Sequence, residues 1–245
     1  MRYLVLSDLH SNWEALDAVL ENGRGQYERI VCCGDLAGYG PDPNAVVDWA
    51  RNNLDVVVRG NHDRACGGIE NLEWFNPVAR AAAIWTMARL SQDNSNYLRG
   101  LPPGPLKTDG FQLIHGSPLD EDEYVITGTD ARSVFDSLDT RVTFFGHTHI
   151  QCGFARARGT FQAMAAVDGR NEMWQKMDPD GIYLINTGSV GQPRDGDSRA
   201  AYALFDSETL ELVQRRVRYD FATTQRKIQT AGLPDILASR LAMGR

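Results

Sequence analysis

This chain is organised around the stretch Val142-Thr143-Phe144-Phe145-Gly146-His147-Thr148-His149. Its apolar first half predicts a buried strand, and the glycine and histidines that follow predict a turn at the end of that strand. Two imidazoles one residue apart on such a turn are suited to binding a metal ion, although an isolated pair of histidines is more often structural. The metal interpretation is favoured because the remaining histidines also stand beside Asp, Asn or Gly after apolar runs: His10, His62 and His115.

Composition predicts a folded protein of ordinary character. A chain of 245 residues with 42% hydrophobic and 23% charged residues buries a substantial core. The formal net charge of -7 argues against broad electrostatic capture of nucleic acid or of an anionic membrane. The start of the chain enters a strand at once, and no apolar stretch is long enough to cross a bilayer. We therefore expect a cytoplasmic protein, with nucleic acid an unlikely partner, no membrane partner and the oligomeric state left open.

Short β-like runs alternate with helical patterns in the first half of the chain, which is typical of an α/β layered fold. Ser11 and Glu14 have the spacing of a capping box, which predicts that a helix begins at Ser11. Asp42 followed by Pro43 predicts the start of a second helix. The predicted strands are 3–6, 30–33, 56–58, 111–114, 142–145, a strand near 154, 160–167, 182–185, 201–205 and 210–219, and further helices are predicted at 78–90, 130–138 and, as a broken pair, 220–245.

We expect a single domain over residues 1–245, because no linker, repeat or low-complexity tract divides it. Residues 65–105 interrupt the strand series with helical patterns, and we interpret them as a helical cap insertion beside the site. The alternative is an ordinary peripheral helix pair. Adjacent Cys32 and Cys33 lie within a predicted strand and should point to opposite faces, as reduced core residues.

Five predicted strand ends carry polar residues that can act as metal ligands. Because loops at the strand ends of an α/β sheet converge, residues far apart in sequence meet at one edge. Carboxylate and amide oxygens mixed with imidazoles suit divalent transition ions such as manganese, iron, zinc or nickel. There are too many ligands for one ion, whereas two ions about 3.5 to 4 Å apart and bridged by a carboxylate would use them all. These residues are Asp8 and His10, Asp35, Asn61 to Asp63, His115, and His147 with His149.

The same segments, in this order, resemble the signature of the calcineurin-like metallophosphoesterase superfamily. The blocks are D-x-H at Asp8, G-D at Gly34, G-N-H-D at Gly60, a lone His115 before glycine, and G-H-x-H at Gly146. The likeness is closest to small prokaryotic phosphodiesterases of the diadenosine-tetraphosphatase-like group. It implies a four-layer αββα sandwich of two mixed β-sheets flanked by helices. It also implies one metal held by Asp8, His10, Asp35 and His149, and a second held by Asp35, Asn61, His115 and His147, with Asp35 as the bridge.

His62 is the histidine that this ligand set does not use. We assign it as the general acid that protonates the leaving group, with Asp63 orienting its ring. The expected reaction is in-line attack at phosphorus by a metal-bridging hydroxide. Asn12 and Arg194 are candidates for contact with the substrate phosphate. The alternatives are a plain helix cap for Asn12 and a surface salt bridge for Arg194.

The protein-phosphatase branch is disfavoured by two departures from its pattern. The block Gly34-Asp35-Leu36-Ala37-Gly38-Tyr39-Gly40 lacks the Arg that clamps phosphate there, and the block from Gly60 ends in Asp63 instead of Glu. Without that clamp a singly charged diester is the better match, so we expect a phosphodiesterase acting on a small phosphoester. The alternatives are a phosphomonoesterase or hydrolase of nucleotides or dinucleoside polyphosphates, and, from another class, a non-catalytic scaffold. Scaffold members usually lose ligands, and here all are present.

Overall fold

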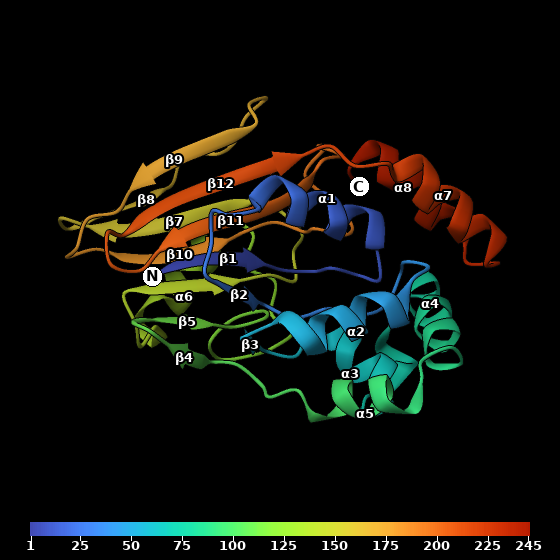
Figure 1. Ribbon diagram of the computed structural model, residues 1–245. Helices are drawn as coiled ribbons and strands as arrows, with labels where there is room; N and C mark the ends of the chain where they lie inside the picture. Colours follow the sequence, from blue (N-terminus) through green and yellow to red (C-terminus); the bar gives the residue numbers. More distant parts are fainter.

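The first of the two β-sheets contains both the first and the last strand of the chain. In the computed structural model, which describes all 245 residues, its strand order is β3-β2-β1-β11-β12-β9 (Figure 1). Strands β1, β2 and β3 are parallel, whereas β11, β12 and β9 join antiparallel. The strands are β1 Arg2–Leu6, β2 Arg29–Cys32, β3 Val56–Val57, β9 Glu172–Lys176, β11 Ala200–Asp206 and β12 Glu211–Val217.

The second sheet has the order β4-β5-β6-β10-β7-β8. Its centre, β5-β6-β10, is parallel, and β4, β7 and β8 are antiparallel to their neighbours. Both sheets are therefore mixed, as predicted. The strands are β4 Leu106–Thr108, β5 Phe111–Leu113, β6 Val142–Phe145, β7 Cys152–Ala157, β8 Thr160–Ala163 and β10 Ile182–Asn186.

The two sheets pack face to face and each carries helices on its outer face, which gives the predicted αββα order of layers. Between the sheets, Tyr3 and Val5 of β1 pack with Phe111 and Phe144 of the other sheet. On the outer face of the first sheet, helices α1 (Trp13–Gly23) and α2 (Pro43–Asn53) cover the alternate residues of β1. On the outer face of the second sheet lies α6 (Gly128–Val134), followed by the 3-10 turn Phe135–Ser137.

Alternation along the strands explains why both faces are apolar. Leu4 and Leu6 contact the helical layer, whereas Tyr3 and Val5 contact the opposite sheet. Cys32 and Cys33 divide in the same way, one into each core, which confirms that they point to opposite faces.

The remaining helices gather at the end of the molecule toward which β1 and β2 point (Figure 1). Helix α4 packs through Ala79 and Ala82 against Ile228 and Leu237 of the C-terminal helices, and α5 packs against α3 and α2. None of the helices is both long and apolar enough to cross a membrane. These elements are α3 Asn61–Gly67, the 3-10 helix η1 Leu72–Trp74, α4 Pro77–Met87, α5 Gln92–Gly100, α7 Phe221–Thr230 and α8 Asp235–Met243.

Three local predictions were wrong or incomplete. Helix α1 is capped by Asn12, whose side-chain oxygen accepts a hydrogen bond from the Ala15 N–H at 3.2 Å, so the cap is not Ser11. Strands β4 and β9 were not predicted, because both are edge strands with largely exposed side chains and therefore lack a strong apolar pattern.

Candidate metal centre

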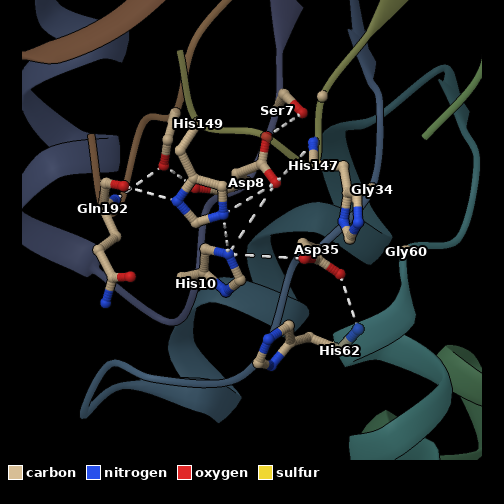
Figure 2. A network of polar contacts seen from close by, with 12 residues as sticks. Ser7, Asp8, His10, Gly34, Asp35, Gly60, His62, His147, His149 and Gln192 are labelled. Atoms are coloured by element: carbon tan, nitrogen blue, oxygen red, sulfur yellow. Dashed lines mark hydrogen bonds and ion pairs between the residues drawn. The ribbon is translucent and has the colours of Figure 1, made fainter. Parts of the chain in front are cut away.

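The predicted ligands come from loops that follow the carboxyl ends of parallel strands in both sheets. Asp8 and His10 follow β1, Asp35 follows β2, and Asn61 begins α3 after β3. The second sheet contributes His115 after β5, and His147 and His149 after β6. The structure brings all of these loops to the shared edge of the two sheets. Figure 2 shows the side chains of Asp8, His10, Asp35 and His149 pointing toward one another.

Backbone strain is concentrated at this edge. Ten residues other than glycine have a positive φ, and seven of them belong to the site loops. A positive φ is costly for a residue with a Cβ and persists where the surrounding structure imposes it, most often at functional sites. The seven are Asp8, His10, Ser11, Asp35, Tyr39, His147 and His149.

The first ligand group contains Asp8, His10, Asp35 and His149, all buried, with ligand atoms within 4.8 Å of one another. Nδ1 of His10 lies 3.1 Å from the Ala37 carbonyl oxygen, and Nδ1 of His149 lies 2.6 Å from that of Gln192. Because a carbonyl only accepts, each Nδ1 carries the hydrogen and each Nε2 presents a lone pair.

These two Nε2 atoms lie 3.0 Å apart, so two lone pairs face each other in a buried site. Burial lowers the pKa of both His10 and His149 well below the usual range, which keeps the rings neutral. Burial also raises the pKa of the neighbouring Asp8 carboxyl to about 7. The donor set therefore fits a cation, which both imidazoles and the carboxylate would coordinate.

The second group contains Asp35, His115 and His147, and Asn61 adjoins it. Nδ1 of His115 donates to the Cys33 carbonyl at 2.7 Å, so its Nε2 points at Asn61 Oδ1, 3.3 Å away. His147 has the opposite arrangement, because its Nε2 donates to the Asp122 carbonyl at 3.0 Å and leaves Nδ1 for the site. Burial lowers the pKa of His115, but the Asp35 carboxylate raises it more, to about 10, so this group also attracts positive charge.

Asp35 belongs to both groups. Its Oδ2 lies 3.5 Å from Nε2 of His10, and its Oδ1 accepts the His62 backbone N–H at 2.9 Å (Figure 2). The same Oδ2 lies 3.5 Å from Nε2 of His115. A Cβ added at Gly60 would collide with Oδ1 of Asp35, which explains the glycine before Asn61. Asp35 is therefore the carboxylate that the two candidate ligand groups have in common.

Comparison with known proteins agrees with this geometry. The family model described as the calcineurin-like phosphoesterase superfamily domain matches residues 1–210. The chain belongs to this superfamily.

The similarity between this phosphoesterase and its relatives extends over almost its full length. An uncharacterized protein of Methanocaldococcus jannaschii is 34% identical over 246 residues, which cover 98% of this chain and 97% of the relative. The crystal structure of a metallophosphoesterase from Sphaerobacter thermophilus is 38% identical with a TM-score of 0.87, covering 100% of this chain and 99% of the other. A hypothetical protein from Pyrococcus horikoshii is 20% identical with a TM-score of 0.80, covering 100% and 98%, and shows the same fold.

His62 lies beside the candidate metal ligands, at the beginning of α3. Its ring is buried and packs 4.3 Å from Tyr39 and 4.9 Å from His10 between ring centroids. It also lines the pocket beside the two candidate ligand groups, which we call the main pocket because of this position and not because of its size. Nδ1 is buried without a hydrogen-bond partner. Burial lowers the pKa of His62 to about 4. A negatively charged substrate would oppose this shift by favouring the protonated ring.

The predicted orienting role of Asp63 is wrong. Its carboxylate accepts four backbone N–H groups, from Asp35 and Leu36 at 2.8 Å, from Gly60 at 3.0 Å and from Ala37 at 3.2 Å, and forms no hydrogen bond with the His62 ring. The reason is geometric: Asp63 is the third residue of α3 and turns back toward the helix start. Asp63 therefore holds the Asp35 loop against α3.

The predicted contact of Asn12 with the substrate phosphate is also wrong, and the alternative of a helix cap is right. Its side chain caps α1, donates to the Gly191 carbonyl at 2.8 Å and accepts from the Thr224 hydroxyl at 3.1 Å. It is buried and does not line the main pocket, so it is not available for phosphate.

Arg194, in contrast, lines the main pocket. Its guanidinium donates to Gln192 Oε1 at 2.9 Å and lies 5.4 Å from the centre of the Tyr39 ring. It pairs with no carboxylate, so the alternative of a surface salt bridge is wrong. Its charge is available to an anion in the pocket.

The main pocket has a volume of about 310 Å³, which is in the range of small-ligand sites. Sequence reasoning missed several of its residues. Tyr39, next to the G-D block, packs on both His10 and His62, and Tyr124 packs on His147 with 4.1 Å between ring centroids. Of these residues only Tyr39 could be linked to the site from sequence, because it lies in the segment where protein phosphatases have the phosphate-clamping Arg.

Proposed function

We propose that this protein is a divalent-metal-dependent phosphodiesterase that uses two metal ions to hydrolyse a small phosphoester. The observation that supports it is the pair of buried ligand groups that share Asp35. The first ion would be held by Asp8, His10, Asp35 and His149, and the second by Asp35, Asn61, His115 and His147. Two bound divalent ions supply a nucleophile from water near neutral pH and neutralise charge on the phosphoryl oxygens.

The residues of the chain have separate tasks in this proposal. His62 is the general acid, because its ring lines the pocket and no acceptor holds its Nδ1. Arg194 binds a phosphoryl oxygen, because it is the pocket guanidinium without a carboxylate partner. Asp63 holds the Asp35 loop and the start of α3 together, which positions the bridging carboxylate relative to His62.

A diester is favoured because the segment after Asp35 offers no guanidinium. Tyr39 occupies that segment, is almost fully buried, and places an aromatic ring against His62 where a clamp would bring charge. Arg194 supports a second candidate, hydrolysis of phosphomonoesters or nucleotides, because one free guanidinium can pair with the additional charge of a monoester.

The test is a comparison of two substrates after controlled metal loading. The protein is stripped with a chelator, reloaded with manganese, iron, zinc or nickel, and assayed with bis-p-nitrophenyl phosphate and p-nitrophenyl phosphate. We expect metal-dependent turnover with a higher kcat/KM for the diester. A strong preference for the monoester would replace the diesterase by the second candidate, and metal binding without turnover of any phosphoester would favour a scaffold.

A further inference from the structure

The wall of the main pocket contributed by residues 70–79 carries an exposed indole. Trp74 ends the 3-10 helix η1, lines the pocket and is 89% exposed, the highest value among the large apolar side chains of the protein. An indole is costly to leave in water, and tryptophan exposed at the mouth of a pocket commonly packs against a ligand.

The backbone on both sides of Trp74 is anchored. Phe75, the next residue, packs edge-on against the His62 ring with 5.3 Å between centroids. Asn71 accepts the Glu73 N–H at 2.9 Å, and Asn76 caps α4 through the N–H groups of Val78 and Ala79. The indole is therefore held at the pocket rim on a fixed segment, so little ordering is needed when a ligand packs on it.

The charge of this wall favours a neutral group over a second phosphate. Arg64 of α3 lines the pocket beside this wall and already binds Glu70 at 2.9 Å, Glu121 at 3.1 Å and Asp122 at 2.6 Å. Glu70 and Asp122 themselves line the pocket. A further anion there would face carboxylates and no free cation, whereas an uncharged planar ring would gain stacking area on Trp74.

We propose that Trp74 is a specificity-determining residue that stacks on the nucleobase of a nucleotide-type substrate. This inference rests on the proposed function, because it places the phosphoester of that substrate at the Asp35 centre. It identifies the substrate class as phosphoesters of nucleosides and gives the segment 70–79 the task of recognising the base.

Binding is measured by calorimetry on manganese-loaded protein with two ligands that resist hydrolysis. One is the phosphonate analogue of adenosine monophosphate and the other is methylphosphonate, which has the anion without the nucleoside. We expect Trp74→Ala to weaken binding of the adenosine phosphonate about tenfold, the size of one base stacked on an aromatic side chain, and to change methylphosphonate less than twofold. Trp74→Phe should restore most of the loss.

Trp174 on β9 provides the matched control, since it is 55% exposed and does not line the pocket. Trp174→Ala should leave both affinities unchanged. Unchanged binding of the adenosine phosphonate in Trp74→Ala would overturn the proposal, and so would an equal loss for both ligands, which would mean that Trp74 only supports the pocket.

A kinetic comparison separates this inference from the proposed function. With thymidine 5′-p-nitrophenyl phosphate, Trp74→Ala should raise KM about tenfold with kcat little changed, while methyl p-nitrophenyl phosphate should respond much less. If the wild-type protein hydrolyses neither ester but Trp74→Ala binds the adenosine phosphonate more weakly, the diesterase proposal is refuted and the base site stands. Hydrolysis of both esters, unaffected by Trp74→Ala, would do the reverse.

Discussion

Replacing Asp63 by asparagine tests whether this residue stabilises the fold or takes part in catalysis. The carboxylate lies buried between α3 and the loop after β2, and both of its oxygens accept backbone N–H groups. Asp63→Asn keeps the shape of the side chain, removes its charge and turns one oxygen into an amino group. The new amino group is itself a hydrogen-bond donor, so it cannot bond to the two backbone N–H groups that it faces.

The expected loss of stability follows from these contacts. Two of the four hydrogen bonds disappear, and a hydrogen bond to a charged group contributes about 1.5–3 kcal/mol net. The other two survive as weaker bonds to a neutral amide oxygen. We therefore expect the free energy of unfolding to fall by about 4 kcal/mol, which is large compared with the usual effect of a single substitution.

The assay is denaturant unfolding of metal-free protein, so that changes in metal affinity do not enter the free energy. Asp130→Asn is the control, because Asp130 also accepts two backbone N–H groups, from Ile126 and Thr127, but in an exposed capping box on α6. Asp130→Asn should lower the free energy of unfolding clearly less than Asp63→Asn does. A change below about 1 kcal/mol for Asp63→Asn, combined with a large fall in kcat, would refute this reasoning and restore the role of orienting His62.

The remaining predictions concern the site and the acid dependence of stability. His62→Asn should severely reduce turnover of diesters with alkoxide leaving groups and only mildly that of p-nitrophenyl esters, which hardly need a proton; equal losses would remove the general-acid role. Asp35→Asn should lower bound metal below one ion per chain, whereas His115→Asn should retain about one, as measured by elemental analysis after dialysis. Hydrogen bonds from Arg59 lower the pKa of Glu121, so this pair stabilises the fold above pH 4.5 and its contribution is lost as the pH falls further. Arg59→Gln should therefore flatten part of the decline of unfolding free energy with acid.

The positions of the candidate metal ligands could be predicted from sequence because each follows an apolar run. A strand buried on both faces is visible as such a run, and the chain must leave the sheet at its carboxyl end. His115 illustrates this, since the only local signal is the strand before it and the glycine after it. The structure brings its imidazole within 3.5 Å of Asp35, as the ordered blocks implied.

The contacts of the neighbouring residues could not be predicted, because they depend on directions that sequence order does not specify. Asp63 stands next to His62 in the chain, but on a helix adjacent side chains diverge, so its carboxylate points back to the loop of Asp35. Trp74 belongs to the 65–105 segment, for which helical patterns were predicted, whereas its place at the pocket rim follows from tertiary packing of Phe75 on the His62 ring.

The orientation of the imidazoles is encoded by main-chain atoms, which any residue type supplies. The carbonyls of Ala37, Cys33 and Gln192 each accept a hydrogen bond from an Nδ1 and so turn Nε2 toward the site. The Asp122 carbonyl accepts from Nε2 of His147 and so leaves Nδ1 there. Because these partners are backbone groups, the ligand set is visible in the sequence while the nitrogen that each ring offers is not. We therefore expect the affinity for a metal ion to depend on the loops around 37, 122 and 192 keeping their conformation, more than on the side chains that they carry.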